Sequence, residues 1–149
     1  MESKIQIDTA LELLTSSSVE IQDRWSQYMQ SAERVHKERN HFDEVSIIID
    51  CIIKLLEDGK TAELAKIFDQ LEAILKAGDD YTNEIMTIGL IEGLQNKCGW
   101  KKIDYHHAFD DWLGEITKKV WHDLIHFWES KESKKRHQQM IRDIKKDGS

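Results

Sequence analysis

The chain has 149 residues, of which 40% are hydrophobic and 33% charged, and it contains no proline. This length predicts one domain with its own core, and no apolar run approaches the ~18 residues that a membrane span needs. The charge is divided unequally, because residues 1–130 hold 14 Lys and Arg against 25 Asp and Glu, whereas residues 131–149 hold 7 against 3. We therefore expect a single domain over 1–130, followed by a basic C-terminal helix or tail over 131–149.

The net charge of −7 also narrows the class of ligand. Phosphate binding requires clustered cations, so the acidic body disfavours nucleic acid and favours a basic protein partner. The N-terminus lacks the basic region and unbroken apolar core of a secretory signal. Cys51 and Cys98 have no CxxC neighbour, which is typical of unpaired thiols in a reducing compartment. The sequence thus predicts a cytoplasmic protein with no membrane segment.

The sequence of the first half of the chain predicts helices separated by short turns. Apolar spacing predicts a short helix at 8–14 and a longer one at 19–40, with serines at 16–18 between them. Asp43 is expected to cap the next helix, which ends at Gly59. The helix after that begins at Thr61 and ends at Gly78.

A nearly apolar helix is predicted from Asp79 or Asp80, either of which can cap it, to Asn96. Its two interior glycines, Gly89 and Gly93, lie four residues apart and share one face. Each costs about 0.5–1 kcal/mol relative to alanine. We therefore expect the backbone of a neighbouring helix to approach this glycine stripe closely. Glu92 is expected to be a buried, hydrogen-bonded carboxylate.

After a predicted loop at 97–102, Asp104 is expected to cap a short helix that ends at Leu113. Gly114 then precedes a helix at 116–130. Short turns between helices force neighbours to pack antiparallel. The prediction is an all-α protein: a compact antiparallel bundle or a short HEAT-like superhelix of seven to eight helices.

Two segments, DDYTNEIMTIGLIEGLQN and DDWLGEITKKVWHDLIHFW, resemble an uncharacterised family of small all-helical bacterial domains. The first carries the pattern N-x-x-x-x-x-G-x-x-E-x-L-Q and the second an L-G pair followed by a helix with an internal Trp. The matching residues are Asn83, Gly89, Glu92, Leu94, Gln95, Leu113, Gly114 and Trp121. In size and acidity the family resembles the immunity proteins of bacterial polymorphic toxin systems. That resemblance implies a small helical protein that binds and blocks a toxin domain.

His122 and His126 lie four residues apart, the spacing of the two zinc ligands in the H-E-x-x-H motif. Asp123 stands in place of the motif's Glu, and no third ligand follows at a recognised spacing. The fold would have to bring His106, His107 or Glu129 close to the two histidines as a third ligand. A metal-dependent hydrolase using these two histidines is therefore the alternative hypothesis, and we expect neither metal nor cofactor.

Trp100, between Gly99 and two lysines, is expected to be an exposed aromatic anchor, since Trp is enriched among binding hot spots. Acidic side chains are expected to steer a cationic partner toward it. The sequence predicts a non-enzymatic protein-binding module, an immunity or antitoxin-type protein that neutralises a basic toxin domain by occlusion, with a helical adaptor as a further alternative. The predicted partner-binding residues are Asp79, Asp80, Glu84, Trp100, Asp104, Asp110 and Asp111.

Overall fold

The computed structural model describes residues 4–31 and 38–147 of the chain. These residues form helices and turns, with no strand among them beyond an isolated bridge between Ile5 and Gly78. The predicted all-α bundle is confirmed. None of the described helices combines the length and the apolar character required to cross a membrane.

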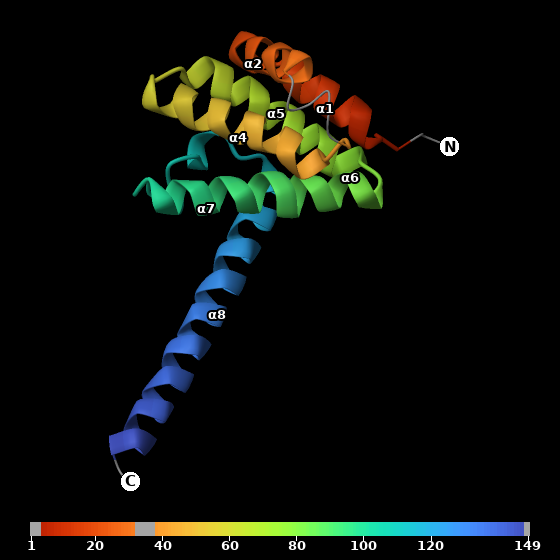
Figure 1. Cartoon of the computed structure of the whole chain (residues 1–149). Coiled ribbons are helices and arrows are strands. Elements are labelled where there is room, and N and C mark those ends of the chain that lie inside the picture. The colour runs from red at the N-terminus through yellow and green to blue at the C-terminus, as the bar shows by residue number, and fades with distance from the viewer. Residues whose placement is uncertain (1–3, 32–37, 148–149) are drawn as a thin grey trace.

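The helices form a packed body from which one long helix projects (Figure 1). α6, η1 and α7 follow one another without a break and make one helical rod, and η1 is a π-helix. The elements in chain order are α1 (Ile7–Ser16), α2 (Val19–Gln30), α4 (His41–Glu57), α5 (Thr61–Ala77), α6 (Asp80–Glu84), η1 (Ile85–Ile91), α7 (Glu92–Trp100), η2 (Asp110–Trp112) and α8 (Glu115–Asp147).

In the first half of the chain, two of the predicted helix boundaries are wrong. The helix predicted over 19–40 ends at Gln30, where Ser31 turns to an extended backbone and its hydroxyl donates to the Tyr28 carbonyl at 2.7 Å. Residues 32–37 of that prediction lie outside the described residues. α4 begins at His41 rather than after Asp43, because the Asn40 side chain accepts from the Phe42 N–H at 2.9 Å.

The core joins α5 to the start of α8 through an aromatic cluster. The ring centroid of Phe109 lies 5.4 Å from those of both Phe68 and Trp121, and all three side chains are fully buried. Cys51 and Cys98 are buried and unpaired, as predicted. Burial raises the pKa of each thiol to about 11, so both remain protonated at neutral pH.

The glycine stripe lies against α4, but the expected close approach of a helix backbone is wrong. A Cβ at Gly89 would lie 3.2 Å from Val45 Cγ2, and one at Gly93 would lie 2.7 Å from Ile49 Cδ1. Side chains of α4, rather than its backbone, fill the space that the glycines leave. Glu92 itself is half-buried, and the carboxylate fully enclosed by the fold is that of Glu44.

α8 begins where a carboxylate from α5 caps it. Glu72 accepts hydrogen bonds from the Ile116 N–H at 3.1 Å, the Thr117 N–H at 2.8 Å and the Thr117 hydroxyl at 2.8 Å. Burial alone would raise the pKa of Glu72, but these hydrogen bonds outweigh it and hold the pKa below its usual value. Gly114 makes room for this cap, because a Cβ there would lie 2.5 Å from Glu72 Cδ.

The helix predicted from Asp104 to Leu113 is replaced by turns and the single 3₁₀ turn of η2. The Asp104 side chain accepts from the His106 N–H at 3.1 Å, which closes a local turn in place of a helix cap. α8 is longer than the predicted 116–130 helix. It crosses residue 130 without interruption and reaches Asp147.

Candidate partner-binding site

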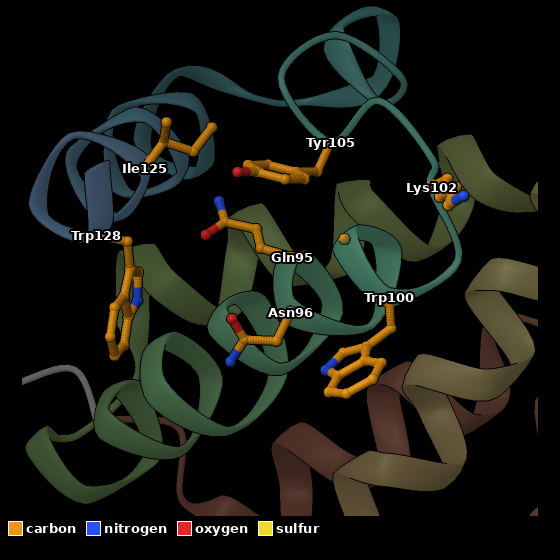
Figure 2. Close-up of a pocket in the computed structure, with 8 residues that line it drawn as sticks. Gln95, Asn96, Trp100, Lys102, Tyr105, Ile125 and Trp128 are labelled. Carbon is orange, nitrogen blue, oxygen red and sulfur yellow. The ribbon is translucent and has the colours of Figure 1, made fainter. Parts of the chain in front are cut away.

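A pocket of about 400 Å³ opens where α7, the segment after it and α8 meet (Figure 2). Three of its eight lining residues are aromatic, and none is an aspartate, glutamate, histidine, cysteine or serine. The lining residues are Gln95, Asn96, Gly99, Trp100, Lys102, Tyr105, Ile125 and Trp128.

Two long-range hydrogen bonds hold the walls in place. The Gln95 side-chain amide donates to the Trp121 carbonyl at 3.0 Å and ties α7 to α8. The Trp121 indole N–H donates to the Tyr105 carbonyl at 2.9 Å and fixes the intervening segment. Gln95 and Trp121 are both almost fully buried. Each of these two buried side-chain donors is satisfied by a backbone carbonyl, and the two hydrogen bonds join the walls of the pocket.

Trp100 stands at the rim and is 89% exposed. It is the last residue of α7, not a loop residue as predicted. The helix ends in a Schellman motif, with the Ile103 N–H donating to the Cys98 carbonyl at 2.8 Å and the Lys102 N–H to the Gly99 carbonyl at 3.2 Å. Lys102 occupies the left-handed position of that motif, with φ of 61°. Glycine usually fills this position, so a lysine there strains the backbone at the rim.

Trp128 forms the opposite wall and is half-buried. Its indole nitrogen Nε1 is shielded from solvent and has no hydrogen-bond partner among the described residues. A buried donor without an acceptor costs free energy that a ligand carbonyl could recover. The Lys131 ammonium lies 5.0 Å from the centroid of the Trp128 ring and leaves this wall flanked by a positive charge.

The structure separates the seven predicted partner-binding residues into two groups. Asp79, Asp80 and Glu84 lie at the start of the helical rod, and Trp100 lies at its other end (Figure 1). A helix of this length spans roughly 30 Å. Asp79 caps α6 by accepting from the Thr82 N–H at 2.8 Å, and its hydrogen bonding to Thr82 lowers the pKa of this carboxyl.

The remaining three aspartates follow α7. Asp104 is four residues beyond Trp100 and therefore lies at the same end of the rod. Asp110 is paired with His107, whose Nδ1 lies 2.9 Å from the Asp110 carboxylate, and this hydrogen bond raises the pKa of His107. Asp111 is exposed. Of the seven predicted residues, Trp100 is the one that lines the pocket.

The histidines of the alternative hypothesis lie on an exposed part of α8. His122 and His126 are both exposed, and no group of three or more His, Cys, Asp or Glu side chains within 4–31 and 38–147 is placed to hold a metal ion. His106, one of the possible third ligands, contacts Glu129 instead, with Nε2 2.8 Å from Oε1.

Seven of the eight lining residues were not among the predicted partner-binding residues, and they include Gln95, Lys102, Tyr105 and Trp128. Trp128 follows Trp121 by seven residues, two helical turns, and this spacing places both on one face of α8. Gln95 belongs to the motif that carries the family resemblance. Nothing in the sequence marks the left-handed backbone of Lys102 or the tie between Tyr105 and α8.

Comparisons with known proteins give a family without a described activity. No curated protein and no solved structure is similar to the chain. A family profile for a domain of unknown function, DUF7674, matches residues 11–129, which is most of the body and both walls of the pocket. The chain therefore belongs to the DUF7674 family.

Proposed function

We propose that this chain is a non-enzymatic protein-binding module of the immunity or antitoxin type, which neutralises a basic toxin domain by covering its working surface. The observation that carries the proposal is Trp100, 89% exposed at the rim of an open aromatic pocket. Exposed tryptophan is uncommon on a surface unless it is an interaction anchor. Placed beside Tyr105 and Trp128, it offers a partner both a protruding side chain and a recess.

The chemistry of the pocket supports binding rather than catalysis. Its titratable lining residues are Lys102 and Tyr105, so it offers no pair of carboxylates and no nucleophile with an adjacent base. Instead it presents the exposed side-chain amide of Asn96, which suits a peptide carbonyl, beside the aromatic rings of Tyr105 and Trp128. This combination of aromatic surface with a few polar groups is typical of a protein–protein anchor site.

Electrostatics supply the second part of the proposal. The 130-residue body carries a net charge of −11, and a field of that sign accelerates encounter with a cationic partner. The exposed carboxylates at the start of the rod steer the partner over a distance, whereas the pocket provides short-range affinity. Two unpaired buried thiols agree with a reducing compartment, and we propose the cytoplasm as the site of action.

The test begins with the genes beside the one that encodes this chain. If a toxin domain is encoded there, we expect the two proteins to co-purify and co-expression of this chain to relieve growth inhibition by the toxin. A Trp100→Ala variant should lose both effects, whereas Val19→Ala, which shortens an apolar side chain on α2 that is 65% exposed, should retain them. If the chain binds no toxin encoded beside it, the proposal is wrong.

A further inference from the structure

The charge of the pocket beside Trp100 differs from that of the body around it. Residues 1–130 carry a net charge of −11, yet the lining of the pocket includes a cation, Lys102, and no carboxylate. Lys102 is exposed, and its ammonium forms no ion pair with any residue that the structure describes. Its neighbour Lys101, in contrast, pairs with Glu57 at 3.3 Å. The charge of Lys102 is therefore available to a ligand.

A second positive charge lies at the opposite wall of the pocket. Trp128 forms that wall, across from Lys102 (Figure 2). The exposed Lys131 ammonium lies 5.0 Å from the centroid of the Trp128 ring. An indole ring attracts cations to its face, and a lysine of the same chain already makes this contact. A lysine or arginine of a partner would therefore meet like charge at both walls.

The carboxylates closest to the pocket in the sequence are engaged in other contacts. Glu129 directly follows Trp128, and its Oε1 lies 2.8 Å from His106 Nε2. Asp104 directly precedes Tyr105, and its side chain accepts from the His106 N–H at 3.1 Å. Neither carboxylate lines the pocket. The pocket thus lacks the anionic group that would hold a cation among its aromatic rings.

The polar groups at the pocket complement a carboxylate. The Lys102 ammonium is a hydrogen-bond donor only, and the exposed Asn96 amide offers two further N–H donors. An ionised carboxylate only accepts, so it can receive hydrogen bonds from both side chains. Charge-assisted hydrogen bonds of this kind are stronger than those between neutral groups. The rings of Trp100 and Tyr105 can cover the apolar stem that carries such a carboxylate.

We propose that the pocket receives a glutamate or aspartate side chain of the protein partner and discriminates against lysine and arginine. This inference rests on the proposed function, because it specifies which chemical group of the partner the anchor site binds. The partner as a whole is basic and is steered by the field of the acidic body. The group that enters the pocket is anionic, and it is recognised only at hydrogen-bond distance. A basic surface alone therefore does not fill the site.

Capped dipeptides test the preference of the pocket without the toxin. Three of them are acetylated and amidated at their ends and carry phenylalanine followed by glutamate, glutamine or lysine. Titration into the full chain is followed through the indole N–H signals of Trp100 and Trp128 in ¹H–¹⁵N NMR spectra, which Trp100→Phe and Trp128→Phe identify. The glutamate peptide should bind at least about threefold more tightly than the glutamine peptide, as expected for an exposed ion pair. The lysine peptide should bind most weakly.

A matched pair of variants assigns the preference to Lys102. Lys102→Gln removes the charge but keeps a Cβ on the left-handed backbone, and it should abolish the preference for glutamate over glutamine. Lys119→Gln removes an exposed charge nine residues before Trp128, on the opposite face of α8, and should retain the preference. Circular dichroism verifies that both variants are folded. If Lys102 only stabilises the end of α7, Lys102→Gln changes the stability and leaves the preference intact, which contradicts the inference.

The outcomes separate this inference from the proposed function. A lysine peptide that binds as tightly as the glutamate peptide, or no change in the indole signals with any peptide, would overturn the inference. A fourth peptide, phenylalanyl-glutamine with a free C-terminal carboxylate, should bind more weakly than the glutamate peptide; tighter binding would show that the pocket takes a chain terminus instead. Toxin binding without a preference for glutamate rejects this inference alone. A preference for glutamate in a chain that binds no toxin encoded beside it rejects the proposed function alone.

Discussion

Lys102 is strained by its backbone, which adopts the left-handed conformation with φ of 61°. For a residue with a Cβ this conformation costs about 1 kcal/mol, and glycine adopts it without that cost. Lys102→Gly should therefore raise the free energy of unfolding by about 0.5–1 kcal/mol in chemical denaturation. Lys101→Gly is the matched control, since Lys101 has a φ of −87° and gains nothing from glycine. If Lys102→Gly is no more stable than Lys101→Gly, the strain assigned to this position is absent.

Glu72 stabilises the body by capping α8 through three hydrogen bonds. Glu72→Gln removes the charge and one acceptor oxygen, so we expect a loss of about 1–2 kcal/mol in the free energy of unfolding. Asp69→Asn, an exposed position on the same helix, should change it much less. Denaturant titrations of both variants at neutral pH measure the difference.

The cap of Glu72 also makes the difference between wild type and Glu72→Gln dependent on pH. Because folding lowers the pKa of this carboxyl, the unfolded state takes up a proton first as the solution is acidified. The stabilisation is complete above the ordinary pKa of about 4.5 and is lost as the pH falls through the lowered value. The stability difference between wild type and Glu72→Gln should therefore shrink from pH 6 to about pH 3. A difference that is constant over this range would contradict the assignment.

At the scale of the helical elements, the rod packs on α4 at its glycines. This contact predicts that mutations at Gly93 and Ile49 have non-additive effects on stability. Gly93→Ala improves helix propensity but places a Cβ 2.7 Å from Ile49 Cδ1. We expect this clash to lower the free energy of unfolding by about 1 kcal/mol net. Ile49→Val removes that methyl group. In a double-mutant cycle measured by denaturation, the Ile49→Val change should therefore cost less in the Gly93→Ala background than in the wild type. Additive effects would show that a Cβ at position 93 and the Ile49 side chain do not clash.

Element boundaries were predictable from the sequence where a local signal sets them. Ser18 and Asp79 cap helices as predicted, and Gly59 ends α4 with a φ of 71°. Some of the missed features are local, such as the Asn40 cap that starts α4 and the Asp104 turn, and others depend on long-range contacts. The cap of α8 comes from Glu72, 44 residues earlier in the chain, and periodicity cannot detect it. The π-helix from Ile85 to Ile91 has no sequence signature, because a uniformly apolar segment fits both kinds of turn.

The candidate site was predictable only in part for the same reason. The exposure of Trp100 followed from its glycine and lysine neighbours. Its pocket depends on Gln95, Tyr105 and Trp121, which meet only after α7 and α8 have packed. The acidic residues were assigned to one partner-binding set because of their charge, whereas the helical rod places them at its two ends.

Considered as a whole, the molecule carries a pocket with three aromatic residues at one end of the rod, carboxylates at the other end and a basic C-terminal half of α8 beyond residue 130. Encounter with a cationic toxin should slow steeply with ionic strength, because the field of the acidic body is screened beyond about 8 Å at physiological salt. Stopped-flow measurements of the association rate between 50 mM and 500 mM salt check this. An association rate that is independent of salt would contradict electrostatic steering by the acidic body.

Titration calorimetry of this chain against the toxin domain encoded beside its gene tests the central claim most directly. The wild type and Val19→Ala should bind with equal affinity. Trp100→Ala should raise the dissociation constant by roughly 30-fold or more, the loss of about 2 kcal/mol that defines a hot spot. If Trp100→Ala binds as tightly as the wild type, the exposed tryptophan and its pocket are not the partner-binding site.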